Sequence, residues 1–263
     1  MIQNSTTRHK TVEVMFGRNR KGIRPHWQNF FWKQIYDTSY LSYVTKGITR
    51  SNFSFYQNNG GTILAIGGKN FSLVASDTRF SIGMTIPSRS TTRIIKISPN
   101  VILASAGMFA DLFILQNLMQ KGIELFRKEN SSICLISNCA FYLSYMLYTK
   151  RFFPYYTFNI LCGLEINREG SVFNFDSIGS FEKNFISCVG NAQSQIQPIL
   201  DGIFQKKSLN FSKDSVSLLA MKSCIKNIFL KISNRNISVG DGLQIFIITK
   251  KGIFIENNFL KLD

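Results

Sequence analysis

Short apolar runs separated by turn residues recur along the chain from Thr62 onward and predict β-strands. The first two runs, TILAIG at 62–67 and FSLVAS at 71–76, are separated by glycine, lysine and asparagine, which is typical of a hairpin turn. We therefore expect these two strands to pair. The same pattern predicts strands at 101–107, 158–166, 171–176, 243–249 and 252–256.

Apolar residues at helical spacing predict three amphipathic helices. The first spans about 109–128, the second about 131–150, and the third follows Asp214, which we interpret as an N-cap. The apolar face of the first consists of Leu112, Leu115, Met119, Gly122 and Phe126, and that of the third consists of Leu218, Met221, Ile225 and Phe229.

The order of these elements predicts an α+β fold, because strands, a pair of helices, strands, further helices and strands follow one another. The helix pair requires a sheet to cover, and strands lie on both sides of it in sequence. A four-layer αββα sandwich, with two antiparallel sheets inside and helices outside, buries every apolar face. We place this domain at residues 61–263.

Residues 1–60 lack this periodicity and form a basic extension. The first fifty residues contain nine Lys or Arg and two acids, so they carry +7 of the net charge of +16. A positive charge permits binding to nucleic acid or to an anionic membrane. Because the densest basic tract is only Arg18-Asn19-Arg20-Lys21, we favour a solvated surface and expect neither partner. The extension is interpreted either as a partly ordered arm or as a propeptide.

Cysteine and histidine positions exclude several kinds of site. The five cysteines form no C-x-x-C pair and mostly lie in apolar runs, which is typical of buried free thiols in a reducing compartment. His9 and His26 both lie in the extension, so neither a histidine metal cage nor a Ser/Cys-His dyad can form in the domain. We therefore expect no metal, no cofactor and no small-molecule substrate.

Targeting and membrane segments are not expected either. The first thirty residues contain no long apolar run, which argues against a secretory signal; a mitochondrial-type leader is the disfavoured alternative for this acid-poor segment. The uncharged stretch 130–149 approaches the length of a membrane span. Its serines favour a buried helix with one polar face instead.

Three motifs in order resemble a beta-type subunit of the proteasome. They are GGTILAIGGKNFSLVASDTR at 60–79, RFFPYYTFNILCGL at 151–164 and GDGLQIFIITKKGI at 240–253. The resemblance covers about residues 57–260 and implies the fold of N-terminal-nucleophile hydrolases. The segment ASDTR is typical of the family at large, whereas GGTILAI and RFFPYY are similar to the sixth beta-type subunit, which is not a catalyst.

Active members of this family cut themselves before a threonine, whose hydroxyl becomes the nucleophile and whose freed amine becomes the base. Alignment on VASDTR places the family's acid on Asp77 and its arginine on Arg79. The family's nucleophile then falls on Gly61 and its lysine on Arg93. The late aspartate falls on Asn236, the late serine on Val239, and the serine of the glycine-serine loop on Asn191 or Gln193. Glycine has no hydroxyl, and a guanidinium cannot become a tuned base. We expect Arg93 to be structural and to pair with Asp77.

Thr62 is the alternative nucleophile, since the bond between Gly61 and Thr62 resembles the family's cleavage junction. Thr62 lies one residue closer to Asp77 than the family spacing requires, and a one-residue slip turns a strand's side chains to the opposite face. We therefore expect Thr62 to begin the strand and to point away from the cleft.

The resemblance implies a non-catalytic, structural subunit in the inner ring of the proteasome core particle, a stacked hetero-oligomer of alpha-type and beta-type subunits in cytoplasm and nucleus. An active threonine endopeptidase using Thr62 and a basic nucleic-acid-binding protein are the alternatives. Phe152, Phe153, Tyr155 and Tyr156 are expected to pack against the core or neighbouring subunits. A chain without its own nucleophile cannot remove its extension, so we expect the extension to persist, in full or trimmed by a neighbour.

Overall fold

The computed structural model describes residues 54–205 and 217–260. The chain divides into two units, Met1–Ser54 and Phe55–Asp263, and every described residue except Ser54 belongs to the second. Residues 1–53 of the predicted extension lie outside the described residues. The last part of that extension, 55–60, belongs to the second unit.

The first sheet is antiparallel and has the strand order β10-β1-β2-β11-β12. Its strands are β1 (Thr62–Gly68), β2 (Phe71–Asp77), β10 (Ile186–Gly190), β11 (Gly242–Thr249) and β12 (Gly252–Phe259). β1 and β2 form the predicted hairpin, and Asn70 in its turn has a φ of 65°, a left-handed conformation that asparagine tolerates.

The second sheet is also antiparallel and has the order β5-β6-β7-β8-β9. Its strands are β5 (Ile94–Ser98), β6 (Val101–Gly107), β7 (Thr157–Leu164), β8 (Gly170–Phe175) and β9 (Phe181–Asn184). A small separate sheet pairs β3 (Phe80–Ile82) with β4 (Thr85–Ser88). It follows directly after β2 in the chain.

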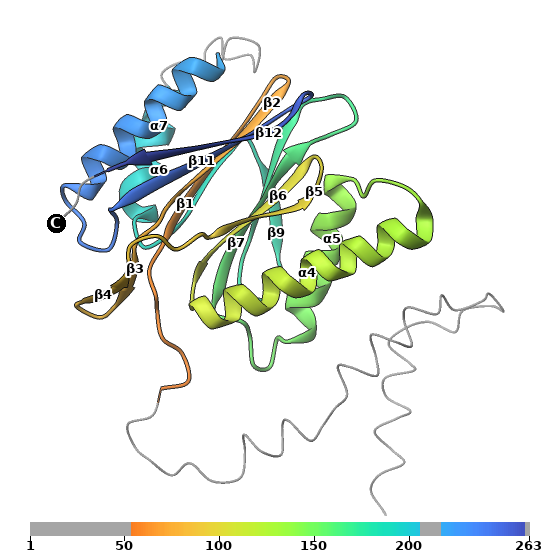
Figure 1. The fold of residues 1–263 in the computed structure, drawn as a ribbon, viewed down its shortest axis with the longest axis horizontal. Helices are drawn as coiled ribbons and strands as arrows, with labels where there is room; N and C mark the ends of the chain where they lie inside the picture. Colours follow the sequence, from red (N-terminus) through yellow and green to blue (C-terminus); the bar gives the residue numbers. More distant parts are fainter. Residues whose placement is uncertain (1–53, 206–216, 261–263) are drawn as a thin grey trace, which may run out of the picture. The chain divides into compact units, whose positions relative to one another are not determined.

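Helices cover the outer faces of both sheets (Figure 1). These are α4 (Phe109–Asn130) and α5 (Ile136–Thr149), which pack on the second sheet, and α6 (Gln193–Gln205) and α7 (Leu218–Ser233), which pack on the first. A third apolar cluster, which includes Ile63, Val74, Ile102 and Ile160, fills the space between the sheets. The predicted α+β, four-layer αββα sandwich is confirmed.

Side chains alternate along β1 between two buried environments. Ile63 and Ala65 belong to the cluster between the sheets, whereas Leu64 and Ile66 belong to the cluster under α6 and α7. All seven residues of β1 are buried, because both faces of its sheet are covered. Odd-numbered positions near the start of β1 therefore face the second sheet, and even-numbered positions face the helices.

Two helix predictions need correction. The helix predicted from residue 131 begins at Ile136, because Ser131 has a φ of 48° and ends α4, and Leu135 has the extended backbone of an N-cap. Asp214, the predicted N-cap of α7, lies outside the described residues; the observed N-cap is Ser217, whose hydroxyl accepts a hydrogen bond from the backbone N–H of Ala220. The spacing of apolar residues in the sequence predicts no bounds for helix α6.

Candidate active site

The fold brings three of the proposed site positions together. Gly61 directly precedes β1, Asp77 is the last residue of β2, and Arg93 directly precedes β5. The backbone N–H of Thr62 donates to Asp77 Oδ1 over 2.7 Å, and Arg93 Nε lies 3.8 Å from the same oxygen. This separation shows that Arg93 and Asp77 form the expected ion pair. Both charged side chains are fully buried.

Arg93 occupies the space that a side chain at position 61 would need. A Cβ built on Gly61 would lie 2.7 Å from Cζ and 2.8 Å from Cδ of Arg93, well inside the separation of about 3.5 to 4.0 Å that carbon atoms prefer. Gly60 and Gly61 also have φ angles of +76° and +95°, which residues other than glycine adopt at a cost. Neither space nor backbone at position 61 suits a larger residue.

The buried pair is only partly satisfied by hydrogen bonds. Arg93 Nη2 donates to the carbonyl oxygens of Asn59 and Arg79, while Asp77 Oδ2 and the Nε and Nη1 atoms of Arg93 have no hydrogen-bond partner in the described part of the chain. Burial raises the pKa of Asp77 to about 6, although Arg93 and the Thr62 N–H both act to lower it. Burial lowers the pKa of Arg93, and Asp77 opposes this shift.

The raised pKa of Asp77 predicts a specific pH dependence of stability. An aspartate in an unfolded chain titrates near pH 4, so between about pH 4 and pH 6 the folded state holds the additional proton. The stability contributed by this carboxyl is therefore complete below about pH 4 and is lost as pH rises toward 6. Asp77→Asn removes the titrating carboxyl. The difference in unfolding free energy between the wild type and the variant should therefore fall over this pH range and stay constant above it. Thermal unfolding at pH 4 to 8 measures this; a constant difference would contradict it.

Thr62 faces the opposite side of the strand from Gly61. Its side chain is fully buried, and its hydroxyl oxygen accepts a hydrogen bond of 3.2 Å from the backbone N–H of Ala192, directly before α6. It shares this face with Leu64 and Ile66, which pack under the helices. The Thr62 hydroxyl thus fixes the start of α6 and is turned away from Arg93.

The remaining proposed positions have other surroundings. Val239 is fully buried in the cluster under α6 and α7. Asn236 Oδ1 accepts hydrogen bonds from the backbone and hydroxyl of Ser238, within its own loop. Asn191 is close to the site, since its backbone N–H donates to the carbonyl of Gly61 over 3.0 Å, whereas Gln193 is exposed at the start of α6.

The family of the chain follows from comparison with known proteins. The proteasome subunit family matches residues 57–248. A proteasome subunit beta type-1-B of Carassius auratus is 34% identical over 212 residues, which cover 80% of this chain and 90% of the relative. The chain belongs to the proteasome subunit family.

Other relatives narrow its type within the proteasome family. A proteasome subunit beta type-1 of Drosophila melanogaster is 35% identical over 224 residues, covering 84% of this chain and 95% of the relative. A proteasome subunit beta type-6 of Saccharomyces cerevisiae is 32% identical over 241 residues, which cover 86% of this chain and 98% of the relative. The resemblance to beta-type subunits is confirmed, whereas the specific likeness to the sixth type stays a prediction.

This proteasome subunit also contains an ion-pair network that sequence reasoning missed. Asp241 accepts two hydrogen bonds from Arg79, 2.9 Å from Nε and 3.1 Å from Nη2, and lies 2.5 Å from Arg89 Nη1. Arg79 and Asp241 are almost completely buried, and Arg79 Nη1 also donates to the carbonyl of Ile237. The network fastens the loop before β11 to the end of β2. Its sequence signal was an arginine after β2 and the GDG triplet at the start of β11.

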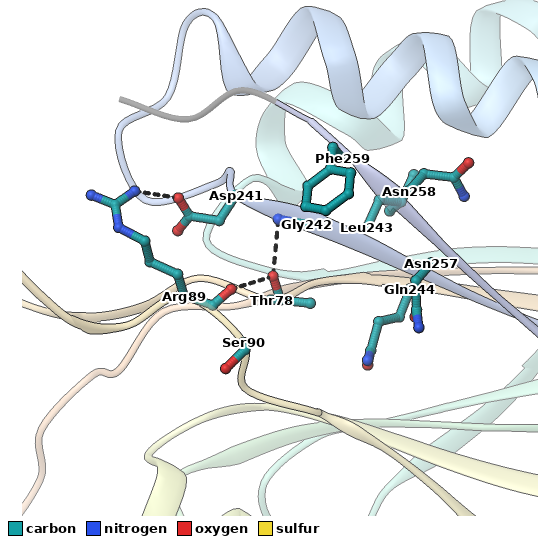
Figure 2. A pocket seen from close by; sticks show the side chains of 10 residues that line it. All are labelled: Thr78, Arg89, Ser90, Asp241, Gly242, Leu243, Gln244, Asn257, Asn258 and Phe259. Atoms are coloured by element: carbon teal, nitrogen blue, oxygen red, sulfur yellow. Dashed lines mark hydrogen bonds and ion pairs between the residues drawn. The ribbon is translucent and has the colours of Figure 1, made fainter.

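A cavity of about 380 Å³ lies beside this network (Figure 2). Thr78 forms part of its wall, where its hydroxyl accepts from the N–H of Gly242 and donates to the carbonyl of Arg89. The cavity is lined by Thr78, Arg89, Ser90, Asp241, Gly242, Leu243, Gln244, Asn257, Asn258 and Phe259. None of the proposed catalytic positions lines it.

The residues described by the structure hold no group of three or more His, Cys, Asp or Glu side chains that could bind a metal ion. Within the same residues, no helix is long and apolar enough to cross a membrane. The five cysteines are free, and all but Cys224 are buried. The expected absence of cofactors stays a prediction.

Proposed function

We propose that this chain is a non-catalytic, structural beta-type subunit in the inner ring of the proteasome core particle, most similar in role to the sixth beta type. The observation that carries this proposal is the position of the Arg93 side chain, which occupies the space that a nucleophilic side chain at position 61 would need. Glycine supplies no hydroxyl, and the guanidinium stays protonated and cannot serve as a base.

The geometry of Thr62 argues against the alternative of an active endopeptidase. The hydroxyl of Thr62 accepts a hydrogen bond at the start of α6, on the other face of β1 from Arg93. A nucleophile requires a nearby base, and the described surroundings of this hydroxyl offer a backbone donor instead.

Assembly with other proteasome subunits is supported by exposed aromatic side chains around the end of α5. Tyr148 near the end of α5 is 55% exposed, and Phe152 just after the helix is 87% exposed. Arg151 stacks its guanidinium over the rings of Tyr148 and Phe152, at 4.7 and 4.4 Å. Aromatic side chains and arginine are enriched at protein interfaces.

The four aromatic residues expected to pack against either the core or neighbouring subunits divide between these two environments. Phe152 and Phe153 are exposed, while Tyr155 packs against the cluster under α4 and α5. Tyr156 lies near Tyr56, with ring centroids 5.6 Å apart. The ring of Phe153 contacts those of Phe55 and Tyr56, with centroids 5.9 and 5.4 Å apart. We therefore assign subunit contacts to Phe152, and packing within the chain to Phe153 and the two tyrosines.

The location and the extension are parts of the same proposal. A proteasome core particle places the chain in cytoplasm and nucleus. Without a nucleophile at position 61 the chain cannot cut its own extension, so residues before Gly61 stay attached, in full or shortened by a neighbouring active subunit. Alpha-type and beta-type subunits are then its partners, with no nucleic acid and no membrane.

Treatment of assembled particles with a threonine-directed covalent inhibitor tests the proposal. The inhibitor should modify catalytic subunits of the same particle, which are the internal control, and leave this chain without added mass. Intact mass spectrometry of the separated subunits measures both. An adduct on Thr62, or a new N-terminus at that residue, would support the active endopeptidase instead.

A further inference from the structure

Strand β12 is an edge strand that lacks the usual protection against pairing with another chain. Within the described part of the chain it pairs with β11 alone, at one end of the first sheet. It is eight residues long, its register with β11 has no bulge, and its sequence GIFIENNF contains neither proline nor lysine. Natural edge strands are usually short, bulged or rich in such residues, because their open backbone groups otherwise pair with a further strand.

The side chains of β12 form two rows, of which the first lies on the side of the helices. Opposite residues of an antiparallel pair point to the same face of the sheet. Phe254 and Glu256 lie opposite Ile247 and Ile245, which pack under α6 and α7. The first row therefore carries one exposed aromatic ring and one carboxylate on the side of α7.

The second row, on the other face of the sheet, begins with apolar residues. Ile253 and Ile255 lie opposite Ile248 and Phe246, which belong to the cluster between the sheets. Ile255 is 58% exposed, and Phe259 at the end of the strand is 88% exposed. Exposed apolar side chains grouped in this way indicate a surface that binds another protein.

The surroundings of β12 are positively charged. Lys222 and Lys226 of α7 both form ion pairs with Glu256. Lys250 and Lys251, in the turn before the strand, are exposed. These four lysines and one glutamate give a net charge of +3, which attracts an acidic partner.

We propose that β12 binds an acidic, extended segment of a partner protein, which adds to the first sheet as a further strand. Hydrogen bonds between the two backbones hold such a segment, and its alternate side chains decide which sequence fits. Its apolar residues lie beside Ile253 and Ile255, and its acidic residues lie on the side of Lys222 and Lys226.

Charge also separates this partner from two other occupants. A second copy of the chain brings the same charge of +3 to a contact between two β12 strands, and the first fifty residues of the chain carry +7. Like charges repel in both cases. The proposal does not depend on the proposed lack of catalysis, since β12 contributes none of the positions of the candidate active site.

A labelled peptide of alternating valine and glutamate, as long as β12, tests the proposal on the full chain. It should bind in fluorescence anisotropy and should slow the hydrogen exchange of residues 252–259. A peptide with proline in place of the central valine loses a backbone donor, and one with lysine in place of glutamate loses the attraction. Each should bind about tenfold more weakly.

Variants of the chain locate the contact. Lys250→Glu with Lys251→Glu reverses the charge around β12 and should weaken binding of the acidic peptide about tenfold. Lys121→Glu with Lys128→Glu is the matched control, because it makes the same change at exposed positions of α4 and should leave the affinity unchanged. Ile255→Ala should weaken binding about threefold through the loss of cross-strand contact.

Several outcomes would overturn the proposal. They are failure of the acidic peptide to bind, binding without slower exchange at 252–259, and equal binding of the proline peptide. Slow exchange of every amide from 252 to 259 in the free chain would also overturn it, because the edge would already be covered. If that slow exchange depends on protein concentration, a second copy is the occupant; if it does not, a segment of the same chain is.

Discussion

Gly61→Thr is expected to lower the free energy of unfolding by about 4 kcal/mol and to create no peptidase activity. Its Cβ would overlap Cζ and Cδ of Arg93, and the φ of +95° is unfavourable for a β-branched residue. Relief of the overlap requires Arg93 to leave Asp77, which would then be a buried carboxylate without its cation. Denaturant unfolding of the purified chain measures the loss of stability.

A second glycine separates the two causes of this destabilisation. Gly252 has a φ of +129°, yet a Cβ built there meets nothing within 4 Å. Gly252→Ala therefore carries backbone strain without overlap, while Gly61→Ala carries both. The alanine variant at 61 should be the less stable of the two by more than about 1 kcal/mol, the lower bound for overpacking. Equal losses would show that Arg93 yields easily and would contradict the packing argument.

Peptidase assays of assembled particles test the other part of the first prediction, that Gly61→Thr creates no peptidase activity. Arg93→Lys should leave every peptidase activity of the particle unchanged, because under the proposed function the chain contributes no catalytic group. The double variant Gly61→Thr with Arg93→Lys should stay silent as well, since Asn236 and Val239 provide neither an acid nor a hydroxyl. New activity in the double variant would show that the surrounding fold is still competent.

Much of the fold was readable from the sequence because its strands are short, apolar and separated by turn residues. Helix α6 was not, since Pro198 and Gly202 lie inside it and both disfavour helices. The structure shows that Ile196 and Leu200 of this helix are fully buried against the first sheet. Burial of that apolar face outweighs the weak local propensity, and only tertiary packing reveals it.

The site was predictable to the extent that it follows from spacing along two paired strands and a family motif. Gly61, Asp77 and Arg93 were expected together, and they lie together. The hydrogen bonds from Asn59 and Gly60 to β3 and β6 were not foreseen, because the register between distant segments cannot be read from one sequence. Asp241 was missed for the same reason, since it lies 162 residues from Arg79.

Asp241→Asn is expected to lower the free energy of unfolding by about 3 to 5 kcal/mol, the cost of leaving a buried ion without its partner. The ion left behind is Arg79, whose side chain is only 1% exposed and donates to both carboxylate oxygens. An asparagine at 241 keeps one acceptor oxygen but loses the negative charge. Glu182→Gln, a change at an exposed carboxylate, is the control and should change stability by less than about 0.5 kcal/mol.

The two arginines of the network should differ sharply in their effects. Arg79→Gln should cost nearly as much as Asp241→Asn, because the carboxylate is then buried beside a neutral amide and the loop at Ile237 loses a donor. Arg89 is 44% exposed, so solvent screens its attraction and Arg89→Gln should cost about 1 kcal/mol or less. Denaturant unfolding of the three variants gives these values. Equal losses of unfolding free energy in Arg79→Gln and Arg89→Gln would contradict the role of burial. They would indicate instead that the stabilisation by the network depends on its total charge.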